Sequence, residues 1–429
     1  MGNALFCPQL HQDGIDCVSG AGFVFMRHPP LLETFNLDDL DAHGVQGTLA
    51  TKGSRVDVPS RKKDLAHYGF DYRFTDPTYE KEARTWTGKK SSTDTDVSSS
   101  NEFDFTTRLY HTKSNDMITK DNFRKFRLHG KLFDDVTDCC QEIVQQGLQD
   151  VYRYDVVTIP VSSQSSVSGG DATPPIQAFV SPDLAERLSI DEDVEPRKAS
   201  TKEEKPVLLI ICGKGQSRAG VLSTKQLVLS GLESGSAVYH ILQAEEQQMS
   251  VIILDPNAWG ERRGMDVVNH SLTYFFGETT TDTKEGTRIS ASARLSKCPL
   301  YIIAHSAAGG YLTRYLSQGV ARETLLRQIN RVAFTDSTHN LQWYNKDQRL
   351  WVYLQSSKCL YIRNNSAPRP FGNHHAKKAG EKHEGDHWWH HRFGNIPTVW
   401  AGTPEHSLMC WTARHVIWDF FTEKTKKTA

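Results

Sequence analysis

The hydrophobic pattern of the chain becomes regular from residue 207 onward. Short apolar runs alternate there with longer segments whose apolar residues recur at helical spacing. Strands that are apolar along their whole length are buried on both faces, so the pattern predicts a mostly parallel sheet with helices on both sides, an α/β fold. The predicted strands are 207–213, 249–257, 299–306, 331–337, 358–364 and 397–403, and the predicted helices are 219–231, 311–329 and 407–421.

Before residue 207 the pattern is interrupted by polar stretches. A helix is predicted within 123–148 and a strand at 155–161. Polar or charged segments that read as linkers or surface excursions lie at 85–101, 163–174 and 188–206. We therefore divide the chain into an N-terminal extension with a Ser/Thr-rich linker, residues 1–100, and an α/β domain, residues 101–429.

Composition excludes several classes of protein. The formal net charge of −1 removes any global field for nucleic acid, and the basic stretches 124–131 and 423–428 are short, so no strong nucleic-acid signal is present. No apolar run approaches the roughly 18 residues that a membrane-spanning helix needs. The eight cysteines form no C-x-x-C pair, and no signal-peptide pattern opens the chain. We expect an intracellular protein with reduced thiols, in the nucleus or cytoplasm.

The first residues, MGNALFC, resemble a lipid-anchoring sequence only in part. Gly2 is the position for myristoylation and Cys7 a position for palmitoylation, but Phe6 stands where the motif has Ser or Thr. An ordinary N-terminus is the prediction, and a lipid anchor at Gly2 and Cys7 is the alternative.

Candidate chemistry begins at PLYIIAHSAAGGY, residues 299–311, where an apolar run stops on Ser306. A sharp strand-to-helix turn that presents a serine needs small residues two positions before and after it, as in the G-x-S-x-G nucleophile elbow. Ala304 and Ala308 stand at those positions, so the size requirement is met without glycine. The pattern predicts that Ser306 is a nucleophile.

The partners of Ser306 are inferred from chain order, which runs nucleophile, acid, histidine in hydrolases of this kind. Asp336 and His406 follow the next strand and the last strand, at the edge where ligand sites of α/β sheets form. The alternatives are His339 as base and Glu405 or Asp255 as acid. In the non-catalytic interpretation, Asp336 caps a turn and His406 caps the final helix.

An acyl-transfer site also needs backbone N–H groups that stabilise an oxyanion. We expect one from Ala307, next to the nucleophile, and one from Gly213 in the turn ICGKGQSRAG, where Gly215 also allows a close approach. Lys214 lies between these glycines, which is not the spacing of a phosphate-binding loop. The sequence therefore predicts no nucleotide cofactor.

A histidine-rich insertion precedes the last predicted strand, within residues 365–395. No pair of these histidines has the H-E-x-x-H order of a zinc site, so we predict an exposed, mobile loop or lid without metal. Its histidines are His374, His375, His383, His387, His390 and His391.

Five stretches together resemble the Argonaute-binding-protein domain family, the Arb2 family: GKGQSRAG, VIILDPN, AHSAAGG, VAFTDSTHN and AGTPEH. The resemblance extends over about residues 101–429. It implies an α/β-hydrolase fold with Ser306, Asp336 and His406 at the triad positions. It also implies partners in Argonaute, small-RNA, chromatin or splicing-linked assemblies.

Two functions follow from these observations. The first is a serine hydrolase that acts on a small ester, thioester or amide. The second is a non-catalytic binding module on the same scaffold. Ala308, where the family usually has glycine, and the insertion at 373–391 are the departures from the family pattern.

Overall fold

The fold is organised around one large sheet with the strand order β15-β14-β13-β12-β8-β9-β7-β6. β7 runs antiparallel to β6 and β9, and every other neighbouring pair is parallel. This arrangement is the α/β-hydrolase fold and confirms the predicted fold class. The strands are β6 (Asp155–Ile159), β7 (Ile176–Val180), β8 (Val207–Ile211), β9 (Ser250–Leu254), β12 (Leu300–His305), β13 (Ile329–Thr335), β14 (Cys359–Arg363) and β15 (Thr398–Trp400).

The structure is a computed structural model that describes part of the chain. The predictions for Gly2, Cys7, His374, His375 and the linker at 85–101 lie outside the described residues. The described residues are 15–17, 24–26, 64–74, 107–160, 174–189, 205–277, 282–283, 286–287, 295–317, 321–344, 347–364, 378–385 and 387–422.

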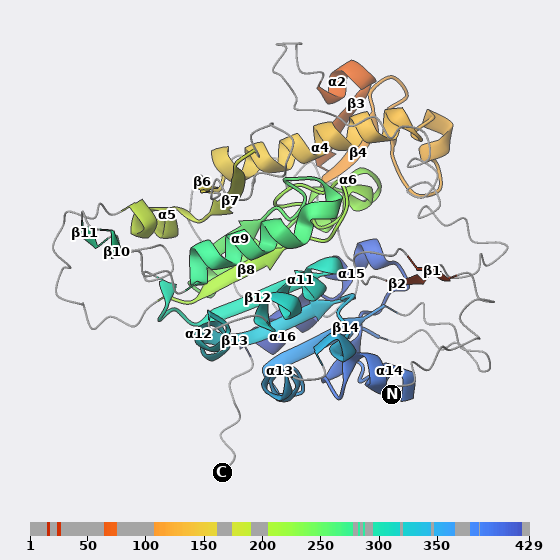
Figure 1. Cartoon of the computed structure of the whole chain (residues 1–429). Helices are drawn as coiled ribbons and strands as arrows, with labels where there is room; N and C mark the ends of the chain where they lie inside the picture. The colour runs from red at the N-terminus through yellow and green to blue at the C-terminus, as the bar shows by residue number, and fades with distance from the viewer. Residues whose placement is uncertain are drawn as a thin grey trace, which may run out of the picture. The chain divides into compact units, whose positions relative to one another are not determined.

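Helices cover both faces of the sheet, as the apolar strands require. In Figure 1, α9 and α11 lie in front of the central strands and α16 lies behind them. Alternate residues of β8 divide between the two faces, and Leu208 and Ile210 join the core beneath α8, α15 and α16. The helices here are α8 (Val238–Glu246), α9 (Gly264–Phe276), α11 (Ala307–Leu316), α12 (Ala321–Gln328), α15 (Met409–Thr412) and α16 (Arg414–Thr422).

Shorter elements connect these layers. The helix predicted over 311–329 is wrong as one element, because the structure has two helices, α11 and α12. The remaining connecting elements are α5 (Pro182–Ser189), α6 (Thr224–Ser230), α7 (Leu232–Gly235), η5 (Glu261–Arg263), β10 (Asp282–Thr283), β11 (Gly286–Thr287), η6 (Leu341–Tyr344), α13 (Gln348–Leu354), α14 (His387–Phe393) and η7 (His406–Leu408).

A small antiparallel sheet of order β3-β4-β5 precedes the large one. Its first strand lies before residue 100 and pairs with a strand after it, so ordered structure crosses the boundary we predicted between extension and domain. The elements of this region are α2 (Leu65–Tyr68), β3 (Phe70–Phe74), β4 (Thr107–His111), β5 (Asp116–Met117), η3 (Phe123–Phe126) and α4 (Lys131–Asp150).

Contacts along the chain divide it into two units. One consists of residues 1–62 and 128–134, and within it β1 (Ile15–Cys17) pairs antiparallel with β2 (Val24–Met26). The other consists of residues 63–127 and 135–429 and contains the large sheet. The candidate site lies entirely within this second unit.

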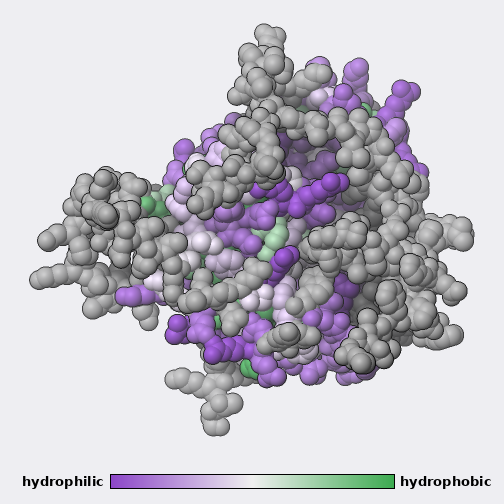
Figure 2. All heavy atoms as spheres, viewed as in Figure 1, coloured by the Kyte–Doolittle hydropathy of each residue, from purple (hydrophilic) through white to green (hydrophobic). Residues whose placement is uncertain are grey.

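The described surface visible in Figure 2 is mostly hydrophilic, with hydrophobic residues as separate spots. Large hydrophobic side chains that are exposed among the described residues are Ile143, Val151, Val156 and Val352. They come from different elements, as is usual for a folded surface.

Candidate active site

Ser306 sits on a strained turn between β12 and α11. Its φ of 55° and ψ of −121° are costly for a residue with a side chain. The turn is fixed by hydrogen bonds, because the Ser306 N–H donates to Thr335 O (2.9 Å) and Ser306 O accepts from the N–H of Thr338 (3.1 Å). A strained turn held from both sides is the conformation that the elbow pattern predicts.

Small residues around the turn are required by contacts with the next strand. Ala304 and Ala308 are fully buried, so methyl groups fit at the two positions that are glycine in G-x-S-x-G. The position without space is Gly309, where a Cβ would lie 1.8 Å from Ser337 Oγ. Glycine is therefore strictly required at position 309, one residue after the second glycine position of the G-x-S-x-G motif.

Gly309→Ala is expected to destabilise the protein by about 1–3 kcal/mol, the usual cost of inserting a methyl group into a packed interior. The matched control is Gly147→Ala in α4, where a new Cβ meets nothing within 4 Å. That change should be neutral or slightly stabilising, because alanine favours a helix over glycine. Thermal unfolding of both variants checks this; equal melting temperatures would contradict the crowding at Gly309.

Asp336 and His406 come together although 70 residues separate them. Asp336 follows β13 directly, and His406 begins η7 after β15. His406 Nδ1 lies 2.6 Å from Asp336 Oδ2, and Asn364 Nδ2 donates to the same oxygen at 2.8 Å. Of the sequence alternatives, this is the pair that the structure brings into hydrogen-bond contact.

The environment keeps the Asp336 carboxyl ionised. Burial acts to raise its pKa, but the hydrogen bond from His406 and the nearby imidazoles outweigh burial and hold the pKa below its usual value. A carboxylate accepts a hydrogen bond from the Nδ1–H group, so neutral His406 carries its hydrogen there and has a lone pair on Nε2. This tautomer is the one that accepts a proton from a nucleophile.

A second imidazole lies against His406. The rings of His305 and His406 are stacked with centroids 4.9 Å apart, and His305 Nδ1 contacts Thr335 Oγ1 at 3.0 Å. Burial, together with the charge of His406, lowers the pKa of His305 to about 3. His305 is therefore a neutral packing surface for His406 near neutral pH.

The competing base, His339, is enclosed in the core. It packs against Phe334 and Phe393, and its Nδ1 lies 2.7 Å from Ser337 Oγ. Burial lowers its pKa to about 3. These contacts give His339 a structural role in the core, next to the turn that carries Ser306.

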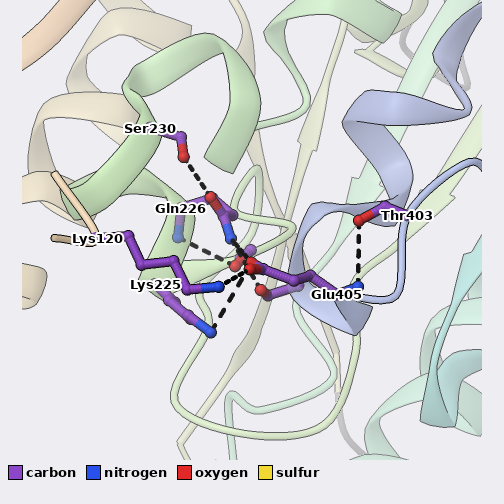
Figure 3. A network of polar contacts seen from close by, with 8 residues as sticks. Lys120, Lys225, Gln226, Ser230, Thr403 and Glu405 are labelled. Carbon is purple, nitrogen blue, oxygen red and sulfur yellow. Dashed lines mark hydrogen bonds and ion pairs between the residues drawn. The ribbon is translucent and has the colours of Figure 1, made fainter. Parts of the chain in front are cut away.

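The competing acid Glu405 belongs to a different network, drawn in Figure 3. Its carboxylate forms an ion pair with Lys120, lies 4.0 Å from Lys225 Nζ and accepts from Gln226 Nε2 at 3.4 Å. Gln226 also donates to Ser407 Oγ at 2.9 Å. Glu405 and Ser407, the residues on either side of His406 in the chain, thus form polar contacts with α6. These contacts fix the loop that carries the imidazole.

The backbone of Gly213 lies against Ser306. A Cβ at Gly213 would lie 3.2 Å from Ser306 Cβ and 3.3 Å from His305 Cδ2, so a larger residue would have to push these neighbours back by a few tenths of an ångström. Within the described part of the chain, the N–H groups of Gly213 and Ala307 donate to no backbone carbonyl. A role for these two amides as oxyanion donors stays a prediction.

The third alternative, Asp255, lies at the end of β9. Its Oδ1 accepts the N–H of Asn257 at 2.9 Å, and burial raises its pKa to about 6. Sequence analysis did not identify Asn257 as a functional residue; the available signal is the polar D-P-N turn directly after a buried strand.

The described part of the histidine-rich insertion is mostly exposed, including His387, His390 and His391, but some of its side chains are anchored in the core. His383 is 8% exposed and Trp389 is 3% exposed. Arg363 donates to His383 Nε2 at 2.5 Å and lies over the Trp389 ring, 4.2 Å from its centroid. Among the residues the structure describes, no three His, Cys, Asp or Glu side chains are grouped to hold a metal.

The fold and these residues define an α/β-hydrolase domain with a strained serine beside a histidine–carboxylate pair. Residues 198–367 match the Arb2 domain, which confirms the resemblance seen in the sequence. This part of the chain is therefore similar to the Arb2 domain. The matched region includes Gly213, Ser306 and Asp336 and ends before His406.

Two curated proteins are similar at low identity. A FAM172 family protein homolog of Caenorhabditis elegans is 24% identical over 205 residues, 48% of this chain and 56% of that protein. The cotranscriptional regulator ARB2A homolog of Gallus gallus is 21% identical over 262 residues, 51% of this chain and 58% of that protein. The chain thus spans little more than half the length of these relatives.

Solved structures with a related arrangement include the fluorophosphonate-binding serine hydrolase F of Staphylococcus aureus. It is 11% identical, with a TM-score of 0.29, and the alignment covers 62% of this chain and 96% of that one. A lipase/esterase from Lactobacillus plantarum is 11% identical with a TM-score of 0.25, covering 50% and 80%. The fold assignment rests on the strand order of the chain itself. Among the described residues, no helix has the length and apolar character needed to cross a membrane.

Proposed function

We propose that the protein is a serine hydrolase that acts on an ester, thioester or amide. The observation that carries the proposal is the hydrogen bond between His406 Nδ1 and Asp336 Oδ2, at the same sheet edge as the strained Ser306. A working triad needs such a pair, because the carboxylate sets the imidazole tautomer and stabilises the imidazolium.

The reaction follows from these roles. Ser306 Oγ attacks the acyl carbonyl while His406 Nε2 takes the serine proton, and Asp336 stabilises the resulting cation. The oxyanion is stabilised by the N–H groups of Gly213 and Ala307. His406 then protonates the leaving group, and a water that it deprotonates releases the acyl group from Ser306.

The test is steady-state hydrolysis of a panel of short-chain and long-chain acyl esters and thioesters by the purified chain. Turnover of at least one member, lost in His406→Ala, is the expected result. The activity should fall at acidic pH, because a protonated imidazole has no lone pair to accept the serine proton. A folded protein that hydrolyses no member of the panel would contradict the proposal.

A second candidate is a binding module in an Argonaute-, chromatin- or splicing-linked assembly, with a location in the nucleus or cytoplasm. It is supported by the Arb2 match and by the name of the Gallus gallus relative, a cotranscriptional regulator. This function does not need a reactive serine, so the two candidates are compatible.

We expect partner binding to survive Ser306→Ala, because removing one hydroxyl at the elbow leaves the exterior unchanged. Affinity purification of the wild type and the variant from cells should recover the same proteins in equal amounts. Loss of the main partner in the variant alone would place that partner at the site and contradict the separation of the two functions.

A further inference from the structure

One side chain holds the loop that leads from β8 to α6, residues 212–223, which we call the oxyanion loop. Asn257, in the turn after β9, reaches three of its backbone groups. Its Oδ1 accepts from the Gly215 N–H at 3.1 Å. Its Nδ2 donates to Gly213 O at 3.0 Å and to Ser217 O at 2.8 Å. The side-chain amide of Asn257 thereby holds the oxyanion loop at Gly213, at Gly215 and at Ser217.

These hydrogen bonds set the orientation of peptide groups and not only the position of the loop. The bond to Gly213 O fixes the plane of the peptide between residues 213 and 214, and the bond to the Gly215 N–H fixes the next plane. A primary amide can donate and accept at once, whereas a carboxylate only accepts and an alkyl group does neither. Only an amide side chain at position 257 can therefore both donate and accept the hydrogen bonds that hold the oxyanion loop.

Asn257 is itself held in place. Its N–H donates to Asp255 Oδ1 at 2.9 Å, and its carbonyl accepts from the Gly260 N–H at 2.8 Å. The Asp255 carboxyl also receives a backbone hydrogen bond from Ala219, in the same oxyanion loop. The turn after β9 and the oxyanion loop are thus joined at two points, through residues 255 and 257.

The part of the oxyanion loop that is hydrogen-bonded to Asn257 is also the part that packs against Ser306. Gly213 packs so closely on Ser306 that a Cβ would come within 3.2 Å of Ser306 Cβ. A rotation of the peptide beyond Gly213 would change the direction of the neighbouring N–H groups relative to Ser306. Oxyanion stabilisation depends on such directions, because donors must point to where charge develops.

We propose that Asn257 is a positioning residue that holds the backbone donors of the oxyanion loop in their reactive orientation. This inference rests on the proposed hydrolase function. Asn257 acts through Gly213 and does not touch the reacting atoms, so its loss should affect the transition state more than substrate binding.

The experiment compares Asn257→Ala and Asn257→Asp with the wild type on an ester that the wild type hydrolyses. The aspartate variant has nearly the same shape but cannot donate to Gly213 O or Ser217 O. Both variants should lose kcat by on the order of 10²-fold, the cost of one misplaced oxyanion donor, with KM little changed. The rate of fluorophosphonate labelling should fall in parallel, and the pH midpoint of kcat should stay constant because His406 is untouched.

Two controls separate positioning from general destabilisation. Asn330→Ala removes an amide whose Nδ2 donates to the Tyr301 hydroxyl, at the opposite end of the sheet from Ser306. Ile329→Val, at the start of β13, lowers stability without approaching the loop. Both should keep the wild-type kcat per folded molecule.

Three results would overturn the inference. If folded Asn257 variants keep the wild-type kcat, the positioning role of Asn257 is contradicted and the hydrolase proposal is unaffected. A wild type without activity would remove both. If Asn257→Ser, the mildest change, and the other two variants all failed to fold, the residue would be required for the fold and not for the orientation of the donors.

Discussion

Ser306→Ala is expected to lower kcat for ester hydrolysis by roughly 10³- to 10⁶-fold, because no other oxygen occupies the elbow to form the acyl-enzyme. The protein should remain folded, since Ala304 and Ala308 show that methyl groups fit on either side of the turn. Residual hydrolysis would come from substrate binding and the oxyanion donors alone.

The matched control is Ser317→Ala at the other end of α11. The Ser317 hydroxyl donates to Arg314 O and caps the helix, so its loss tests the effect of removing a serine from the same helix away from the elbow. Its kcat should equal that of the wild type. If Ser306→Ala retained wild-type kcat, the observed activity would belong to another site.

Asp336→Asn should lower kcat by up to about 10⁴-fold. The wild-type carboxylate accepts a hydrogen bond from His406 Nδ1–H, whereas an asparagine can donate its own N–H to that nitrogen. The imidazole then carries its proton on Nε2 and cannot accept one from Ser306. Steady-state kinetics measures the loss, which should appear in kcat with KM little changed.

Asp183→Asn is the matched control for the loss of a hydrogen-bonded carboxylate, although the Asp183 side chain is half-buried and not buried. Like Asp336, Asp183 has a pKa below the ordinary value despite burial, here because Lys205 and Ser250 donate to it. It lies at the start of α5, away from the elbow. Its replacement should reduce stability but leave kcat per folded molecule unchanged; equal kinetic losses in both variants would contradict the orienting role of Asp336.

The pH dependence of stability follows from the same carboxyl. Because the folded-state pKa of Asp336 is depressed, its contribution to stability is complete above its unfolded value near 4 and is lost as pH falls through the folded value. Asp336→Asn should remove this part of the acid sensitivity. The stability of the variant at low pH should therefore approach that of the wild type.

The sheet edge was predictable because its strands are apolar throughout and end on polar residues. The runs around β8, β9, β12 and β13 are long enough to be recognised from the sequence, and their order places Ser306 and Asp336 at one edge. The elbow was also predictable, since only small residues permit a strained turn of this kind.

Other features depend on contacts that no local pattern carries. The direction of the strand β7 depends on its pairing with β6 and β9. The helix α9 is a different case, because its apolar residues do recur at helical spacing and the prediction missed them. The choice of His406 over His339 depends on tertiary burial, which encloses His339 in the core. The hydrogen bonds of Asn257 to the oxyanion loop join residues about 40 positions apart, so they can be seen only in the folded chain.

The most direct test of the central claim is mass spectrometry of the purified chain after reaction with a fluorophosphonate. We expect one adduct, on the peptide that contains Ser306, with no labelling in Ser306→Ala and slow labelling in Asp336→Asn. A folded wild-type protein that forms no adduct at Ser306, under conditions that label a known serine hydrolase, would contradict the account.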